Sequence, residues 1–182
     1  MRIDCRLPPE PDWPWLISTY PGDVLLHVDR SFQDIADRIC GRVAYLATPY
    51  TREVLGADLH WDRGLSIGAE IRAARWARVF ALAGATVVSP IILACAICHS
   101  DFEGDLNPLD EAFWARWCQP LLNACGAVVI PAIAGWDRSR GVWREACWAL
   151  QRNVPVYLVA EGLEFSGSKI CAQSAARGGG GP

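Results

Sequence analysis

The feature that most constrains the fold is a regular alternation of short apolar runs with amphipathic helical stretches. Four runs rich in β-branched residues are typical of strands buried on both faces. They cover residues 43–48, 85–93, 127–133 and 154–160. Helical periodicity fills the gaps between them. This order predicts a single doubly wound, flavodoxin- or Rossmann-like α/β domain over residues 40–162, with a parallel sheet of about four to five strands and right-handed crossovers.

Local signals mark the expected ends of the helices. Ser66 is placed to cap the start of the first helix and Gly84 its end. The second helix is expected to begin at 107–108, because proline suits the first helical position, and Pro120 is expected to kink it. The last helix is predicted over about 140–152.

The two ends of the chain differ in composition from this centre. Prolines are frequent near the start, which predicts an extended N-terminal arm over residues 1–39 instead of regular elements. Residues 163–182 are rich in glycine and serine and are predicted to form a disordered tail.

The composition excludes several classes of protein. The 182-residue chain is 52% hydrophobic and 20% charged, with a formal net charge of −3, which is typical of one globular domain with a full core. Such mild acidity offers no basic surface for a nucleic-acid polymer. No apolar run approaches the roughly 20 residues that span a membrane, and the start of the chain lacks the features of a secretion signal. We therefore expect a cytoplasmic protein that acts on small molecules.

The cysteines are expected to be thiols that pack in the core, as is usual in a reducing compartment. The segment 95–99 matches the pattern of covalent haem attachment, but that chemistry requires an exported chain. A zinc site is disfavoured because no second paired cluster of ligands follows. We expect no cofactor and no metal. His99 is predicted to lie just after a strand, at the same sheet edge as Ser139, either facing a ligand or serving as a structural histidine.

The loop and helix over residues 135–146 are the strongest candidate for a binding site. Open α/β sheets bind ligands at the carboxyl ends of their strands, at the switch point where the strand order reverses. Here that point is expected between residues 45–50 and 130–137. Ser139 and Gly141 stand at a helix N-terminus, which suits a phosphate group. Nearby arginines, at 52, 138 and 140, are placed to add positive charge.

Two motifs resemble those of the nucleoside 2-deoxyribosyltransferase superfamily, over about residues 42–160. They are the segment Val-Ala-Tyr-Leu-Ala-Thr-Pro-Tyr at 43–50 and the pattern Ser139-x-Gly141-x-x-x-Glu145-x-x-x-Ala149. The form of the second motif is most similar to a phage and bacterial branch. The resemblance implies a glutamate nucleophile at Glu145 and a hydrogen bond to it from Tyr45. Such a carboxylate can stabilise and then capture the cationic carbon that forms when an N-glycosidic bond breaks.

The resemblance also bears on the substrate. Transferases of this superfamily carry an acid six positions before the nucleophile, whereas the monophosphate glycosidases carry a serine, as this chain does at Ser139. A nucleoside 5′-monophosphate is therefore expected over a free nucleoside. The chain departs from the family at the aspartate that contacts the base, because that position reads Cys118. Asp110, Asp137 or His99 are the candidates to replace it.

The function expected is thus cleavage or transfer of the N-glycosidic bond of a nucleoside or nucleoside 5′-monophosphate. The predicted catalytic residues are Glu145, Tyr45 and Asp137, and the predicted substrate-binding residues are Ser139, Gly141, Arg138, Arg52, Pro49, His99 and Trp136. The resemblance further implies a homo-oligomer, a dimer or tetramer, whose site is completed across subunits.

Other interpretations of the same residues compete with this one. A non-catalytic nucleotide sensor would use the same loop for phosphate and Glu145 for a ribose hydroxyl. An interaction domain would account for the nine tryptophans. Tyr45 is then a core aromatic, and Glu145 a solvated acid on a surface helix.

Overall fold

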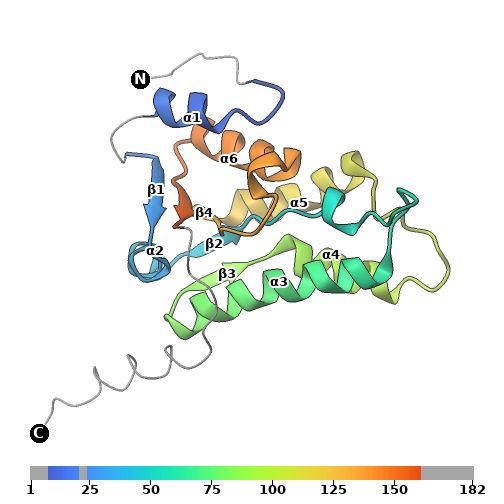
Figure 1. Cartoon of the computed structure of the whole chain (residues 1–182). Coiled ribbons are helices and arrows are strands. Elements are labelled where there is room, and N and C mark those ends of the chain that lie inside the picture. Colours follow the sequence, from blue (N-terminus) through green and yellow to red (C-terminus); the bar gives the residue numbers. More distant parts are fainter. Residues whose placement is uncertain (1–7, 21–23, 161–182) are drawn as a thin grey trace, which may run out of the picture.

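The computed structural model describes residues 8–20 and 24–160, which form an α/β fold around a parallel sheet (Figure 1). The sheet has five strands in the order β1-β5-β4-β2-β3, and every neighbouring pair is parallel. The strands are β1 (Leu26–Arg30), β2 (Val43–Leu46), β3 (Thr86–Val88), β4 (Ala127–Ile130) and β5 (Val156–Val159). The predicted fold class is confirmed.

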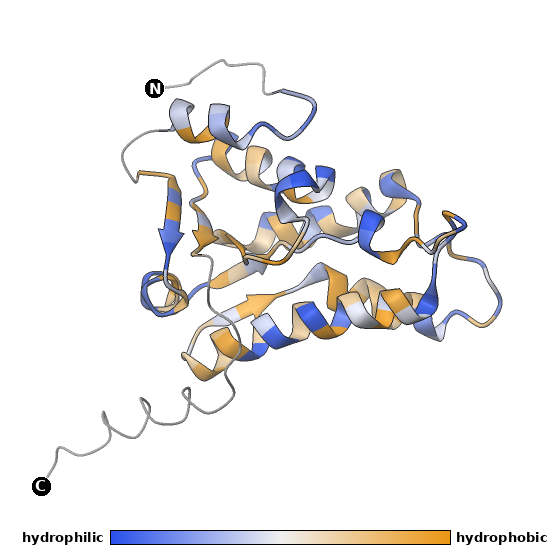
Figure 2. Ribbon diagram, viewed as in Figure 1, coloured by the Kyte–Doolittle hydropathy of each residue, from blue (hydrophilic) through white to orange (hydrophobic). Residues whose placement is uncertain are grey.

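Helices cover both faces of this sheet. They are α1 (Trp13–Thr19), α2 (Phe32–Ile39), α3 (Arg63–Leu82), α4 (Pro90–Ser100), α5 (Glu111–Ala124) and α6 (Arg140–Gln151), with 3-10 turns η1 (Thr51–Val54) and η2 (Trp136–Arg138). Side chains alternate along β4, because Val128 and Ile130 pack with α1, α5 and α6 while Val129 packs with α2 and α3. Figure 2 shows the hydrophobic strands between helices with mixed surfaces. The double burial explains the nearly continuous apolar runs of the sequence.

The segment 85–93, expected to be one strand, is in fact a short strand followed by a helix. Strand β3 ends at Val88, and the Ser89 side chain accepts a hydrogen bond from the Ile92 N–H at 3.4 Å as α4 begins at Pro90. Serine followed by proline is a helix-start signal, but the apolar character of the helix hides its period. His99 therefore lies in the last turn of α4 and not just after a strand.

Helix α3 begins one turn earlier than the expected cap at Ser66. Asp62 caps it by accepting a hydrogen bond from the Leu65 N–H at 2.8 Å, and Ser66 lies fully buried inside the helix. Gly84 follows its C-terminus with a φ of +80°, as predicted. Helix α5 begins at Glu111, later than expected, with Asp110 as its cap, and contains Pro120.

The expected extended N-terminal arm is wrong for the described residues, which form α1, β1 and α2 there. Asp12 accepts a hydrogen bond from the Trp15 N–H, and Pro14 occupies the first turn, where proline favours a helix. Strand β1 then adds to the edge of the sheet beside β5. The predicted disordered tail lies outside the described residues. Among the described residues no helix is long and apolar enough to cross a membrane.

Candidate functional site

A cavity of about 510 Å³ opens at the carboxyl edge of the sheet, where β2 and β4 lie side by side. The chain leaves β2 toward β3 on one side and returns through β4 on the other, so this is the switch point of the sheet. Residues that follow β2 form one wall and the start of α6 forms another, while α4 and α5 contribute the rest. The cavity is of a size that suits small ligands.

A buried tyrosine and a glutamate are joined at the floor of this cavity. Tyr45 in β2 is fully buried, and its hydroxyl donates a hydrogen bond to Oε1 of Glu145 at 2.6 Å. Burial and the neighbouring charge of Glu145 raise the pKa of Tyr45 far above its usual range, so the phenol stays a donor. The hydrogen bond that the family resemblance implied is present. Tyr45 is a core residue as well, because it belongs to the apolar cluster that packs between the sheet and α1, α5 and α6.

The carboxyl of Glu145 is held in an unusual state of ionisation. Burial raises its pKa to about 7, and the hydrogen bond from Tyr45 and the charge of Arg144 act in the opposite direction. Helix α6 places Glu145 in its second turn, facing the cavity rather than solvent. Ionised and protonated forms therefore coexist near neutral pH, which is typical of groups that exchange protons or attack electrophiles.

Cys118 of α5 lines the cavity next to this pair. Burial first, and then the charge of Glu145, raise the pKa of its thiol to about 11. The position that reads aspartate in the resembling family thus carries a neutral thiol beside the Tyr45–Glu145 pair.

Most of the predicted binding residues come together around the Tyr45–Glu145 pair. Ser139 caps α6 by accepting a hydrogen bond from the Val142 N–H at 3.4 Å, and Gly141 follows in the first turn. The cavity wall contains Ser139, Gly141, Arg138, Arg52 and Pro49. Arg140 also lines the cavity, but its guanidinium is paired with the carboxylate of Glu10, with Nε to Oε2 at 2.9 Å. It is therefore less available to a ligand than Arg52 or Arg138.

Three predicted site residues lie outside the cavity wall: Asp137, Trp136 and His99. The exposed Asp137 carboxylate lies 3.9 Å from Arg138, while its backbone carbonyl accepts a hydrogen bond from the Trp13 indole at 2.8 Å. Trp136 packs edge-on against Trp13, with ring centroids 4.7 Å apart. The N-terminal helix thus contacts η2 at Trp136 and Asp137, while the flanking Gly135 and Arg138 line the cavity.

His99 faces α3 and bonds Ser66 and Glu70 there. Asp110, which had been a candidate to contact the base, caps α5 and is also absent from the wall. None of the three candidate replacements for the family's aspartate therefore lines the cavity.

The structure adds wall residues that sequence reasoning missed. Two further carboxylates line the cavity, Glu53 and Glu111, and Glu111 pairs with Arg144 at 3.7 Å. Aromatic side chains of Tyr50, Trp114 and Trp148 also line it. Trp148 lies three residues after Glu145, so helical spacing was an available signal. Tyr50 and Glu53 lie beside the predicted Pro49 and Arg52 after β2, whereas Glu111 and Trp114 belong to α5, which gave no local signal.

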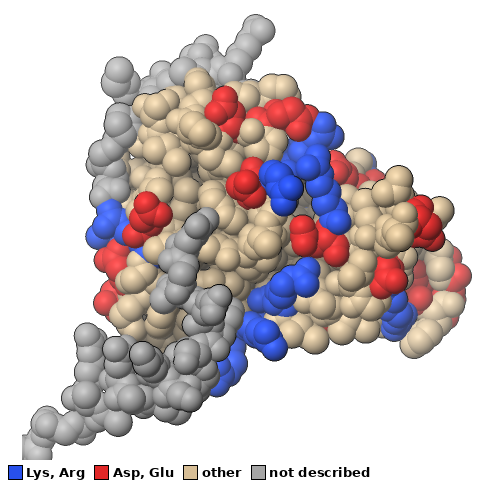
Figure 3. Space-filling view, in the orientation of Figure 1, with Lys and Arg blue, Asp and Glu red and all other residues tan. Residues whose placement is uncertain are grey.

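One glycine in the loop has a left-handed backbone conformation beside the cavity wall. Gly135 has a φ of +85°, and a Cβ added there would lie 2.6 Å from Oε1 of Glu53. The positive φ favours glycine, and any larger residue would also require the Glu53 carboxylate to move. Figure 3 shows basic and acidic side chains interspersed on this face. The surroundings of the cavity are of mixed charge rather than strongly basic.

Fold and site together define a class: an α/β protein with a Rossmann-like parallel sheet and a tyrosine–glutamate pair in a cavity at its switch point. The chain belongs to the family described as Domain of unknown function (DUF1937), whose family model matches residues 42–161. A comparison with curated proteins finds no match. The matched segment runs from β2 to the end of β5 and contains both members of the pair.

Proposed function

We propose that this protein cleaves or transfers the N-glycosidic bond of a nucleoside or nucleoside 5′-monophosphate, with Glu145 as nucleophile. The observation that carries the proposal is the 2.6 Å hydrogen bond from Tyr45 to Glu145 inside the cavity. It is supported by the resemblance of the two motifs to the nucleoside 2-deoxyribosyltransferase superfamily. A buried carboxylate held by a phenol is suited to attack a carbon that gains positive charge.

The reaction proceeds in two displacement steps at the anomeric carbon. A carboxylate oxygen of Glu145 bonds to C1′ as the C1′–N bond breaks, and the electron pair of that bond leaves with the base, which takes up a proton. Water or a second base then attacks C1′ and frees the carboxylate. Tyr45 keeps Glu145 in place and favours its ionised form, because the phenol donates to a charged oxygen.

The walls of the cavity support a nucleotide-sized substrate. Trp114 and Trp148 offer flat apolar surface for a base. Ser139 and Gly141 at the N-terminus of α6, with Arg138 and Arg52 nearby, suit a 5′-phosphate. A monophosphate is therefore the proposed substrate. Glu53 and Glu111 are the other carboxyl groups of the cavity that could protonate the leaving base.

The direct test is to incubate the purified protein with nucleosides and 5′-monophosphates and measure free base. Glu145→Gln should lower base release by at least about 100-fold, since an amide cannot attack C1′. Asp137→Asn is the matched control, because Asp137 is exposed and lies outside the cavity wall. Equal activity of Glu145→Gln and wild type would refute the nucleophile assignment.

Ser139→Ala tests the phosphate assignment. Loss of its hydrogen bond to a charged group should weaken monophosphate turnover by about 1–2 kcal/mol relative to the parent nucleoside. The ratio of the two kcat/KM values is the readout, because loss of the helix cap affects both substrates alike. Equal losses for both would favour a free nucleoside. A rise in Tm with mononucleotides and no base release would instead favour the non-catalytic sensor.

A further inference from the structure

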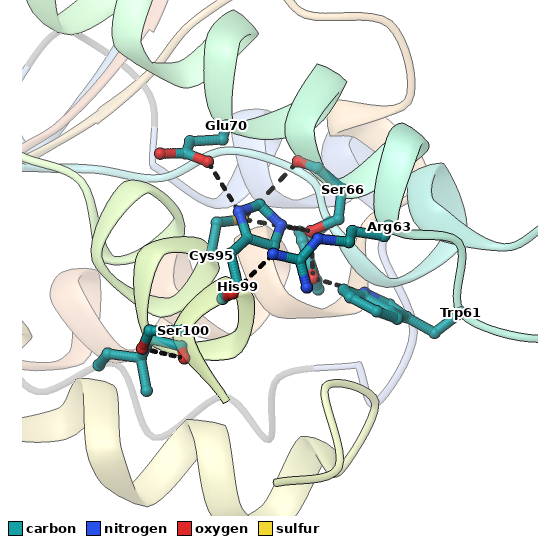
Figure 4. Close-up of polar contacts among 9 residues, drawn as sticks. Trp61, Arg63, Ser66, Glu70, Cys95, His99 and Ser100 are labelled. Atoms are coloured by element: carbon teal, nitrogen blue, oxygen red, sulfur yellow. Dashed lines mark hydrogen bonds and ion pairs between the residues drawn. The ribbon is translucent and has the colours of Figure 1, made fainter. Parts of the chain in front are cut away.

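A second cluster of chemically reactive side chains lies between α3 and α4, outside the cavity wall. It consists of Glu70 on α3 with Cys95 and His99 on α4 (Figure 4). One ligand atom from each residue lies within 4.8 Å of the other two. Cys95 and His99 are four positions apart, so they share one face of their helix. Each is a residue type that binds transition metals.

The separation of two of these atoms matches that of zinc ligands. His99 Nδ1 lies 3.2 Å from Oε2 of Glu70. In tetrahedral zinc sites with bonds of about 2.0–2.1 Å, nitrogen and oxygen ligands lie about 3.3–3.4 Å apart. Cys95 Sγ lies 3.6 Å from Ser66 Oγ and 3.8 Å from the Ser66 carbonyl oxygen, on the same side of α3. Small side-chain rotations would bring the three donors around one ion.

The side of the His99 ring opposite Glu70 makes a further hydrogen bond. Its Nε2 lies 3.0 Å from Oγ of Ser66, which is fully buried and also contacts the Tyr50 hydroxyl at 2.9 Å. Metal-bound histidines commonly donate their other ring N–H to such an oxygen, which orients the ring. Arg63 Nη2 donates to the His99 carbonyl oxygen at 2.6 Å and fixes the end of α4. The ring therefore turns Nδ1 toward Glu70.

The cluster is closed on the cysteine side and open on the other. Cys95 is fully buried, whereas the side chains of His99 and Glu70 are 14% and 28% exposed. Burial raises the pKa of the Cys95 thiol, and the Glu70 charge adds to this effect. An ion entering from the exposed side must displace the thiol proton, and a water molecule can complete its coordination there.

We propose that Glu70, Cys95 and His99 form a Zn²⁺ site that joins α3 to α4. Thiolate, imidazole and carboxylate together suit zinc, whereas Mg²⁺ and Ca²⁺ prefer oxygen ligands alone. Binding forms a Zn–S bond and releases the Cys95 proton to solvent. The sequence disfavoured zinc because no second paired cluster follows Cys98. The fold supplies the third ligand, Glu70, from a different helix. Cys98 instead lines the cavity at the carboxyl edge of the sheet.

The experiment uses the whole chain, reduced, freed of metal with a chelator and then titrated with Zn²⁺ by calorimetry and with Co²⁺ by absorption. We expect saturation at one equivalent, a thiolate-to-cobalt charge-transfer band, and a rise in Tm with Zn²⁺. Cys95→Ser should abolish the band and weaken Zn²⁺ binding by at least about 100-fold. Ser66→Ala removes only the hydrogen-bond partner of His99 and should have a smaller effect, roughly 10- to 100-fold. None of these measurements depends on the proposed enzymatic activity.

Cys98→Ser is the matched control. It removes a thiol that lies one turn from Cys95 on the same helix but lines the cavity. It should keep the cobalt band and the stoichiometry. Absence of saturable Zn²⁺ binding to wild type would overturn the proposal and leave His99 as a hydrogen-bonded structural residue. A band that survives Cys95→Ser, or disappears in Cys98→Ser, would also overturn it. If Cys95→Ser fails to fold, the wild-type titration decides alone.

Discussion

Replacing Tyr45 by phenylalanine should move the ionisation of Glu145 to higher pH. Burial raises the pKa of Glu145 to about 7, and the hydrogen bond from Tyr45 lowers it from what burial alone would give. A hydrogen bond to a charged group contributes about 1.5–3 kcal/mol. Because one pKa unit corresponds to about 1.4 kcal/mol, Tyr45→Phe should raise the pKa of Glu145 by roughly 1–2 units. The ring volume is nearly unchanged, so the buried packing is kept.

Base release measured against pH is the assay. In wild type the rate should rise through about pH 7, as Glu145 loses its proton and becomes nucleophilic. In Tyr45→Phe the rise should shift to about pH 8–9, so that activity at pH 7 falls roughly 5- to 50-fold and partly recovers in alkali. Infrared titration of the carboxyl, with Glu145→Gln as the blank, gives the same midpoint without any substrate. An unchanged midpoint would refute the role of this hydrogen bond.

Three further predictions concern stability. Glu145→Gln should stabilise the fold by roughly 2–4 kcal/mol above pH 7. Folding raises the pKa of Glu145 from 4.5 to about 7, so wild type loses stability as the pH rises through that range. A difference in Tm that does not depend on pH would contradict this. Gly135→Ala should lower stability in urea unfolding more than Gly84→Ala does. Both glycines have a positive φ, but only a Cβ at Gly135 would meet the Glu53 carboxylate. Equal losses would show that this contact is relieved easily. Trp13→Ala should lower the free energy of unfolding by about 3–5 kcal/mol, because the indole is buried against two other tryptophans. Urea unfolding measures this, and a loss under about 1 kcal/mol would show that α1 adds little to the stability of the fold.

The sequence was enough to predict a parallel sheet containing β2, β4 and β5, but not β1, which lies in the segment expected to be an extended arm. Strands buried on both faces need apolar residues at every position, and the helices between them keep a local period, so the alternation is visible without any tertiary information. The resemblance of the two motifs to the nucleoside 2-deoxyribosyltransferase superfamily implied that Tyr45 pairs with Glu145, and strand ends and helix starts do meet at one edge of such a sheet. Their hydrogen bond follows from that arrangement.

Local signals were ambiguous where one residue type serves two purposes. Prolines near the start suggested an extended arm, but Pro14 begins a helix instead. The apolar segment after Val88 has no polar face, because Leu93 and Ile97 on the exposed side of α4 are apolar too, so it was taken for a continuation of β3. Apolar residues on the exposed side remove the alternation of apolar and polar positions that identifies a helix.

Contacts between distant segments were decided only by the tertiary structure. Trp13 donates a hydrogen bond to the backbone carbonyl of Asp137, whose side chain does not line the cavity. Glu70 meets His99 from another helix. Such pairs depend on how helices cross and rotate in packing, and no spacing within one segment carries that information. The sequence by itself therefore determined the alternation of β2, β4 and β5 with helices α3, α5 and α6, while packing determined which side chains share a site.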